Sequence, residues 1–530
     1  MIALLALSAH ADTPDNWKFT LDGYYRNRGF IFSDLFEGQT KPATYLQTRL
    51  RLQPGLNFED RAKFFMMVDG FDDVVWGDNE SLASTALFAG DPSVTGFDGA
   101  VQDPIKLKRA WMDFKFALGS VRVGRMPSQW GMGLLANGGD GFDDTFGENH
   151  FGSTYDRVIF ATKPITVATT IAQMAGGKGK VKDPPLFVAV GVDRLVEDPL
   201  IQYYGFECDP ETPTEGCDSD DDHGVTEERT DDRRTDAWWV DTQDDVWEMI
   251  YVLIWRGDGQ KFGPNTIGDL TAGLYMVNRR QEETDSNVLI VDGYAKVEVK
   301  GLYFEGEILH IGGDTRAITL TSSDVEDPLY KKANIWGYVA KGGLQNERWT
   351  AILEHGYASG DNEPTDPDFT GRPLHPDYNV GFVLYEEILS RVTAATWGEG
   401  AKGLWSNGGV YNSRYVFPNV RFRPITNWEF SGAWLVAWPS QPDGARIFCA
   451  EGDDVECVAY PATSKMLGWE ADLAIKHRFA DHVNFTLEGG FAHVTDRVNL
   501  RGAGLNTEID KDGHTYGNFF TLQSRIAYEF

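Results

Sequence analysis

The sequence lacks any long hydrophobic run and is poor in positive charge. No stretch approaches the roughly 18 consecutive apolar residues of a transmembrane helix, so a helical membrane protein is excluded. Lysine and arginine number 48 against 80 aspartates and glutamates, which gives a formal net charge of −32. Because nucleic-acid binding needs a basic face that neutralises phosphates, we expect no nucleic-acid partner.

Cysteine is also scarce, and the four cysteines fall into two local pairs, Cys208 with Cys217 and Cys449 with Cys457. In an exported chain this close pairing predicts two disulfides, each closing a loop. A metal site is the weaker alternative, because neither pair has CxxC spacing or histidines placed as in a zinc site.

The motifs of common hydrolases, metalloproteases and nucleotide-binding enzymes are absent as well. The ten histidines are scattered, and none accompanies a serine or cysteine in a recognisable arrangement. We therefore expect no enzyme and no resident cofactor. The acidic segment 197–245 leaves one alternative open, since Asp218, Asp220 and Asp222 could bind a calcium ion there. An acidic loop tip without a ligand is the simpler interpretation.

The N-terminal segment 1–11 is apolar and ends in Ala9-His10-Ala11, a small-x-small pattern that signal peptidase accepts. It predicts an exported protein. Because no positive charge precedes the apolar residues, we interpret the segment as a truncated signal peptide. A hydrophobic first strand is the alternative.

The C-terminal segment 520–530 places Phe520, Leu522, Ile526, Tyr528 and Phe530 on one face and Thr521, Gln523, Arg525 and Glu529 on the other. This period of two, over about ten residues, is typical of a tilted strand that crosses a bilayer with one face toward lipid. Its apolar face ends in Ile526, Tyr528 and Phe530, and this ending resembles the signal read by the outer-membrane barrel assembly machinery. A docked edge strand of a soluble protein is the alternative.

Similar segments recur along the whole chain and predict about 18 strands. They lie near 17–28, 44–58, 62–74, 105–117, 120–126, 156–163, 186–196, 246–256, 268–280, 287–299, 301–311, 334–343, 348–358, 410–421, 425–437, 465–478, 483–495 and 519–530. The joins between them are alternately long and short, with long loops near 77–104, 127–155, 197–245, 359–409 and 438–464.

Long extracellular loops that alternate with short periplasmic turns are typical of outer-membrane barrels. The sequence therefore predicts an all-β fold, with residues 12–530 forming a single transmembrane antiparallel barrel in the bacterial outer membrane. The segment 165–174 is ambiguous. We interpret it as part of a periplasmic excursion, while a further strand there would change the strand count.

Polar residues on the predicted strands must face the lumen, because a charge facing lipid at mid-membrane costs roughly 2–4 kcal/mol. This rule gives candidate pore-lining residues of mixed sign: Arg26, Arg49, Arg51, Arg122, Arg279, Glu305, Glu307, Glu354, Arg414, Glu470, Asp472, Lys476, Glu488 and Arg525. They could form a constriction that selects permeants by charge, or they could mainly pair with one another and stiffen the wall. The loop 359–409 contains apolar residues at helical spacing and is the expected plug, although a helix exposed to solvent is equally compatible.

Two stretches, 121–137 and 355–366 with 373–381 beyond it, resemble the alginate-export family of Gram-negative porins. The resemblance implies an 18-stranded barrel that passes an anionic polysaccharide along basic residues. It also implies that Arg122 and Arg125 are pore or pore-mouth cations. The many lumenal carboxylates depart from that pattern and argue against export of a polyanion.

Three functions follow from these expectations. The first is passive diffusion of small hydrophilic solutes, the second is export of an anionic surface polysaccharide, and the third is a non-conducting adhesion or scaffold barrel. The expected partners are outer-membrane lipid and lipopolysaccharide, the barrel assembly machinery, and the permeant, whether a small solute or a polysaccharide. The sequence does not fix an oligomeric state.

Overall fold

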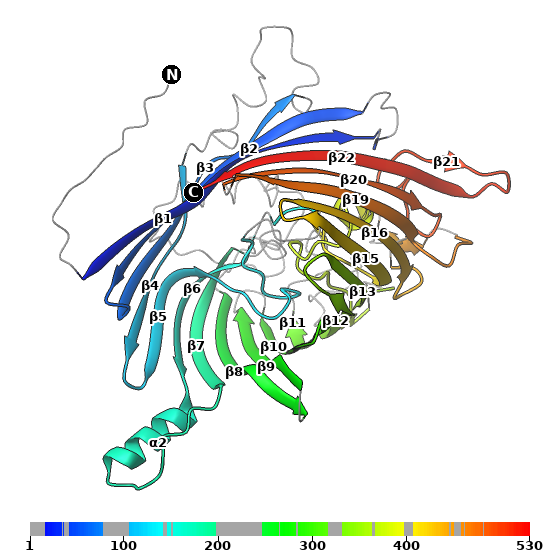
Figure 1. Ribbon diagram of the computed structural model, residues 1–530. Coiled ribbons are helices and arrows are strands. Elements are labelled where there is room, and N and C mark those ends of the chain that lie inside the picture. The colour runs from blue at the N-terminus through cyan, green and yellow to red at the C-terminus, as the bar shows by residue number, and fades with distance from the viewer. Residues whose placement is uncertain are drawn as a thin grey trace.

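A computed structural model (Figure 1) describes the chain apart from residues 1–15, 34, 37–41, 78–104, 141–145, 150–151, 198–245, 264–265, 282–284, 316–330, 363–365, 397–405, 445–446, 450–456, 460–461 and 481. Within the described residues, eighteen strands form one ring. These strands are β1 (Trp17–Phe32), β2 (Ala43–Phe58), β3 (Ala62–Gly77), β4 (Ile105–Phe116), β5 (Gly119–Pro127), β6 (Thr154–Thr162), β7 (Leu186–Glu197), β8 (Val246–Gly263), β9 (Thr266–Gln281), β10 (Ser286–Val299), β11 (Leu302–Thr315), β12 (Lys331–Gln345), β13 (Trp349–Ala358), β15 (Ser413–Ile425), β16 (Trp428–Pro439), β19 (Gly468–Phe479), β20 (Val483–Val494) and β22 (Thr515–Glu529).

The ring is closed by its two end strands. Each barrel strand pairs antiparallel with the barrel strands before and after it, and β1 pairs with β22 from Tyr24↔Glu529 to Phe32↔Thr521. Closure leaves no unpaired sheet edge, which is the condition for a sheet to span lipid. The predicted closed antiparallel barrel of 18 strands is confirmed.

The outer face of the barrel is apolar. Large side chains there are 40–71% exposed, among them Leu46, Leu56, Met112, Val192, Leu253, Ile308, Leu353, Leu473 and Leu522. Each alternates with a residue that points inward, as the two-residue period of a strand requires. Exposure of this many apolar side chains is favourable only against hydrocarbon, so this face is the lipid-facing surface. No helix among the described residues is long and apolar enough to cross a membrane.

One end of the barrel carries tight turns, and we call it the turn end. At the β2–β3 turn Glu59 and Asp60 have positive φ angles, and the Arg61 N–H donates to the Phe58 carbonyl at 2.9 Å. Lys300 and Gly301 both have positive φ between β10 and β11. Two central residues with positive φ form the turn that matches the twist of paired strands.

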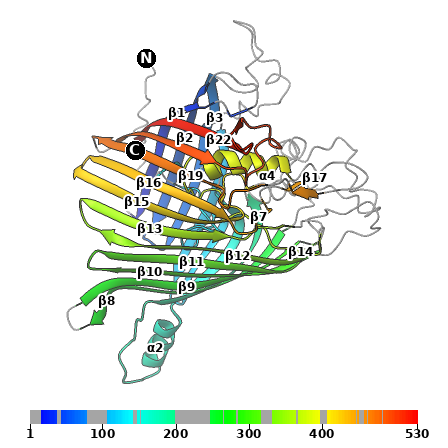
Figure 2. The ribbon, with the colours of Figure 1, turned by 90° about the vertical axis from the view of Figure 1, so that its right-hand side faces the viewer.

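The opposite end carries the long connections, and we call it the loop end (Figure 2). Short elements lie in these connections: β14 (Asp368–Phe369), the π-helix η2 (Leu384–Leu389), α4 (Ser390–Thr396), β17 (Ile447–Cys449), β18 (Cys457–Ala459) and β21 (Glu508–Ile509). The register of β17 and β18 sets Cys449 directly opposite Cys457. The disulfide between them stays a prediction.

The ambiguous segment 165–174 forms a helix, α2 (Pro164–Met174), in the β6–β7 connection at the turn end. The interpretation that it adds no strand is therefore confirmed. Several expectations fall outside the described residues: the signal peptide 1–11, the Cys208–Cys217 disulfide, the calcium site at Asp218, Asp220 and Asp222, and most of the loops 77–104 and 197–245.

Candidate functional site

Buried arginines follow one side of the inner wall. They lie on β1, β2, β4 and β6, and we call them the arginine strip: Arg26, Arg28, Arg49, Arg51, Arg109 and Arg157. Arg26 and Arg49 stand directly opposite each other in the β1–β2 register. A buried guanidinium needs hydrogen-bond acceptors. The function of the lumen therefore depends on which groups bind the guanidiniums of the arginine strip.

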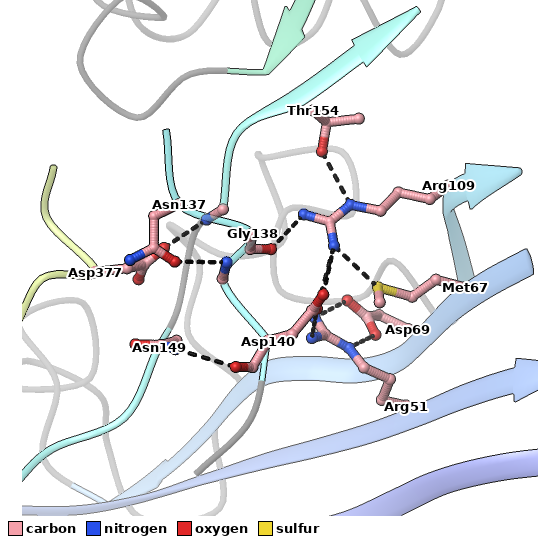
Figure 3. A network of polar contacts seen from close by, with 12 residues as sticks. Arg51, Met67, Asp69, Arg109, Asn137, Gly138, Asp140, Asn149, Thr154 and Asp377 are labelled. Atoms are coloured by element: carbon pink, nitrogen blue, oxygen red, sulfur yellow. Dashed lines mark hydrogen bonds and ion pairs between the residues drawn. The ribbon is translucent and has the colours of Figure 1, made fainter. Parts of the chain in front are cut away.

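Two arginines of the strip bind a chain segment that folds into the barrel (Figure 3). Arg51 binds Asp69 on β3 through two contacts of 2.7 and 2.8 Å, and it reaches Asp140 at 3.4 Å. Arg109 donates to Asp140 at 3.1 Å and to the Gly138 carbonyl at 2.7 Å. The connection between β5 and β6 is therefore attached to the wall inside the lumen.

We call the described residues of this connection, 128–140, 146–149 and 152–153, the first inward loop, and they also reach the β9–β11 wall. Trp130 stacks on Tyr275 of β9 with ring centroids 5.4 Å apart, and its indole N–H donates to Asp292 of β10 at 3.1 Å. Glu307 of β11 accepts the backbone N–H groups of Met132 and Leu134. The loop thus contacts strands on both sides of the lumen and narrows it.

The connection from β13 to β15 supplies a second inward loop, by which we mean its described residues 359–362, 366–396 and 406–412. Glu470 of β19 accepts the backbone N–H groups of Phe382 at 2.5 Å, Val383 at 2.9 Å and Leu384 at 2.7 Å. These amides begin η2, whose Leu384, Tyr385, Ile388 and Leu389 are buried. A carboxylate is favourable at the start of a helix because the first N–H groups there lack partners within the helix.

The two inward loops bind each other. Gly152 N–H donates to Asp377 at 2.6 Å, His375 N–H donates to the Leu134 carbonyl at 2.8 Å, and the Ser153 hydroxyl lies 3.1 Å from His375 Nε2. The expected plug, the loop containing η2, is thus an inward loop with a buried helix. The inward course of the first loop was not predicted from the sequence.

Glu148 of the first inward loop connects opposite ends of the chain. Its carboxylate lies 2.6 Å from Arg26 Nε on β1 and 3.3 Å from Arg525 Nη1 on β22. The side chain is 1% exposed. Glu488 of β20 also lies close enough to Arg525, Arg28 and Lys476 to interact with them electrostatically, and Glu386 interacts with Arg28. With Arg26 and Arg49 included, the cations around this layer outnumber these carboxylates.

Two cavities meet at this layer. The larger, of about 700 Å³, lies toward the turn end and is lined by residues that include Asp22, Gln53, Lys476 and Arg525. The smaller, of about 280 Å³, lies toward the loop end, with Arg28, Gln47, Glu386 and Gln523 in its lining. Glu148 lines the smaller cavity and Arg525 the larger, so their contact forms the boundary between the two.

Most candidate pore-lining residues have side chains on the inner face of the barrel. They are Arg26, Arg49, Arg51, Arg122, Arg279, Glu305, Glu307, Glu354, Glu470, Asp472, Lys476, Glu488 and Arg525. Some pair with neighbouring strands, as Arg279 does with Glu248 at 2.5 Å and Arg122 with Asp113 at 2.6 Å. Glu354 instead accepts the hydroxyls of Tyr378 and Tyr415 at 2.9 and 2.6 Å, and so holds the second inward loop.

Two candidates differ from the expectation, because Arg125 and Arg414 lie on the outer face. Arg125 alternates with buried Met126 and pairs with Asp156 at 2.9 Å, and both side chains are nearly half exposed. Arg414 is exposed between buried Ser413 and Tyr415. At one of these positions Tyr415 packs against Tyr385 of the second inward loop with ring centroids 6.0 Å apart, so Arg414 beside it faces outward. At the other, buried Met126 faces inward and Arg125 beside it faces outward.

The sequence analysis did not single out Arg28, Arg109, Arg157, Asp140 or Glu148. Arg28 stands two residues after Arg26 on the same face of β1, and this spacing could have identified it. Asp140 and Glu148 lie in a loop without periodicity, and no local pattern marks them. Among the described residues, no group of three or more His, Cys, Asp or Glu side chains is arranged to hold a metal ion.

No protein-family model matches the sequence, and no curated protein matches it. Among solved structures, a BenF-like porin from Pseudomonas fluorescens Pf-5 is similar, with 8% identity, a TM-score of 0.48, and coverage of 97% of this chain and 98% of that chain. OccK9 (OpdG) from Pseudomonas aeruginosa has 9% identity, a TM-score of 0.47 and coverage of 97% and 99%. The outer-membrane protein OpdK from Pseudomonas aeruginosa has 8% identity, a TM-score of 0.45 and coverage of 96% and 99%. None of the three is described as an alginate exporter, and at these values the likeness carries no argument about the family or function of this chain.

Proposed function

We propose that the protein is a channel of the bacterial outer membrane through which small hydrophilic solutes diffuse passively, with a preference for anions. The observation that carries the proposal is a polar, arginine-rich lumen inside a closed barrel whose outer face is apolar. A barrel of this strand number is wide enough for an aqueous path unless loops enter it. Here two inward loops enter, so passage is selective rather than open.

The preference for anions follows from where the carboxylates are used. Glu307, Glu354 and Glu470 accept hydrogen bonds from the inward loops, so their oxygens point at the loops and not into an open path. At the boundary between the two cavities, Arg26 and Arg525 both contact Glu148, and the surrounding cations outnumber the carboxylates. Cations fixed at a narrow level of a low-dielectric pore attract anions and repel cations.

Planar-bilayer recordings of the purified chain test both parts of the proposal. We expect discrete conductance steps, and under a salt gradient a reversal potential that indicates anion preference. Replacing Arg26 and Arg49 together with alanine should reduce the anion preference. Arg348, which is exposed in the β12–β13 turn, provides the control, because Arg348→Ala removes a charge away from the boundary.

Folding of each variant is checked by its heat-dependent shift in electrophoretic mobility, so that loss of conductance is not mistaken for loss of fold. Folded wild-type protein without any conductance would refute the channel and favour the non-conducting scaffold. Cation preference in the wild type would refute the charge argument while leaving the channel intact.

Export of an anionic surface polysaccharide is the second candidate, and the arginine strip is the observation that favours it. A polymer needs a continuous wide path, whereas the two inward loops bind each other across the lumen. Loss of a surface glycan in a deletion strain would favour export. Unaltered glycan together with small-solute uptake would favour diffusion.

A further inference from the structure

The helix α2 distinguishes one connection from the others at the turn end. The β2–β3, β4–β5 and β10–β11 joins contain only a few residues each, whereas the β6–β7 join runs from residue 163 to residue 185. Figures 1 and 2 both show α2 outside the ring of strands. None of its residues is buried.

The threonine face of α2 is held by the returning chain. Thr166 donates to Asp183 at 2.7 Å, and Lys163 donates to the same carboxylate at 3.0 Å. The Lys182 N–H donates to the Thr169 hydroxyl at 3.1 Å. These hydrogen bonds lower the pKa of Asp183, first through Thr166 and then through Lys163, so the carboxylate stays ionised and fixes which face of the helix points away.

The face that points away is apolar. Ile165, Ala168, Ile171 and Ala172 recur along it at the spacing of neighbouring turns of a helix, and all are exposed. Ile171 is 54% exposed, and Met174 at the end of the helix is 84% exposed. A helix of this kind, with one apolar face and a polar opposite face, is typical of segments that lie in a membrane interface.

A cluster of positive charge follows directly. Lys178, Lys180 and Lys182 are exposed within five residues of one another, separated by Gly179 and Val181. In a chain with a net charge of −32 such a cluster is a local exception. Closely spaced lysines at a membrane surface bind anionic lipid headgroups.

The apolar face of α2 continues the lipid-facing surface of the strands beside it. Val158 of β6, and Val190 and Val192 of β7, are 44–47% exposed on the outer face. Leu118 in the adjacent β4–β5 turn is 51% exposed, and its carbonyl accepts the Thr162 hydroxyl at 2.6 Å. The helix therefore starts at the rim of the surface that contacts hydrocarbon.

We propose that α2 is an interfacial anchor that lies in the headgroup layer of the periplasmic leaflet. Its apolar face contacts the upper acyl chains, and Lys178, Lys180 and Lys182 bind the phosphates of anionic phospholipids. This anchor is a lipid-binding site separate from the lumen, and it fixes the depth and tilt of the barrel at β6 and β7.

The test uses the full-length barrel in vesicles and a fluorophore attached to Ile171→Cys. A matched label at Asn346→Cys, in the exposed β12–β13 turn, serves as the control. Vesicles consist of phosphatidylcholine with or without phosphatidylglycerol, and both contain a lipid with a quencher near the headgroup. We expect stronger quenching at position 171 than at 346, and a further increase with phosphatidylglycerol. Replacing the three lysines with serine should abolish that increase.

Two results would overturn the anchor. One is equal quenching at 171 and 346, with both labels open to aqueous iodide. The other is protection of 171 only when soluble peptidoglycan fragments are added, which would assign the helix to a glycan partner. Phosphatidylglycerol-dependent quenching that survives the lysine substitutions would overturn the proposed phosphate contacts. Conductance of the same labelled proteins is recorded separately, so failure of the channel proposal is distinguished from failure of the anchor.

Discussion

Arg26 is fully enclosed in the lumen, and the carboxylate of Glu148 lies 2.6 Å from it. The same carboxylate contacts Arg525, whose guanidinium also donates to the Gly147 carbonyl. A loop residue thus occupies the position that an anion in transit would take between the two arginines. At the scale of single residues, Glu148 offsets part of the positive charge of this layer, together with Glu488 beside Arg525.

Replacing Glu148 with glutamine tests this contribution. The substitution keeps the shape of the side chain and removes the negative charge, so the layer becomes more positive. We expect the ratio of chloride to potassium permeability to rise about fivefold, which corresponds to about 1 kcal/mol. Reversal potentials under a salt gradient measure the ratio. Glu347→Gln, in an exposed turn, makes the same charge change away from the lumen and should leave the ratio unaltered. An equal shift in both variants would show that net charge alone is responsible.

At the scale of elements, carboxylates of the wall position the inward loops. Glu307 binds amides of the first loop and Glu470 binds amides of the second, while Glu354 binds the hydroxyls of Tyr378 and Tyr415. Hydrogen bonds to charged groups contribute about 1.5–3 kcal/mol each, more than those between neutral groups. The lumenal carboxylates therefore determine how far the lumen is closed.

Glu470→Gln should weaken the attachment of η2, because a neutral acceptor replaces a charged one beneath three N–H groups. We expect more frequent openings and a larger mean conductance in single-channel recordings, while the barrel itself stays folded. The loss of loop stability should reach about 2 kcal/mol, within the range for charged hydrogen bonds. Glu347→Gln again serves as the control. Openings unchanged from the wild type would show that the apolar contacts of η2 hold the loop without Glu470.

A second attachment, at the loop end, depends on pH. Asp496 accepts the N–H groups of Thr463 at 2.8 Å and Ser464 at 2.9 Å. Burial acts to raise the pKa of Asp496, but these hydrogen bonds, with that of the Thr463 hydroxyl, hold it below its ordinary value. A lowered folded pKa stabilises the loop above about pH 3.9, the unperturbed value, and this stabilisation is lost as the pH falls through the folded pKa.

Amide hydrogen exchange, corrected for the intrinsic effect of pH, measures that loss. Protection of Thr463 and Ser464 should be constant near neutral pH and should fall below about pH 3.9. Asp496→Asn should show the reduced protection already at neutral pH. Protection that does not change with pH would mean that Asp496 does not hold this attachment.

At the scale of the whole molecule, the barrel is completed by its two chain ends. Gly23 and Phe530 exchange two backbone hydrogen bonds of 3.1 Å, next to the β1–β22 pairing. Ile526, Tyr528 and Phe530 lie on the lipid-facing side, and they are 54%, 50% and 37% exposed. Strand β22 therefore has two roles. Its backbone closes the barrel, and its outward-facing side chains carry the predicted signal for the assembly machinery.

Phe530→Ala separates these two roles, because it keeps the backbone hydrogen bonds and removes the aromatic ring. We expect several-fold less folded protein in the outer membrane of cells, and unchanged refolding of the purified chain in detergent. The heat-dependent mobility shift measures the folded fraction in both settings. Phe520→Ala, on the same face and 42% exposed, is the control. Equal losses in cells and in detergent would assign Phe530 to stability and not to recognition.

The sequence by itself determined the barrel. Alternation of polarity has a period of two residues, and the lengths of loops and turns are properties of the chain alone, so strand number and closure followed from local pattern. Local pattern left 165–174 ambiguous between a strand and a periplasmic excursion, and the structure places the helix α2 there.

Only the tertiary structure decided what fills the lumen. Arg125 and Arg414 face outward, and beside Arg414 the inner face of the wall packs against the second inward loop, a contact that the alternation rule does not include. Glu148 meets Arg26 and Arg525 across 122 and 377 positions of sequence, and no local pattern specifies a contact between such distant residues. The barrel wall is specified by patterns among residues that are close in sequence, whereas the constriction depends on contacts between loop and wall residues that are far apart in sequence.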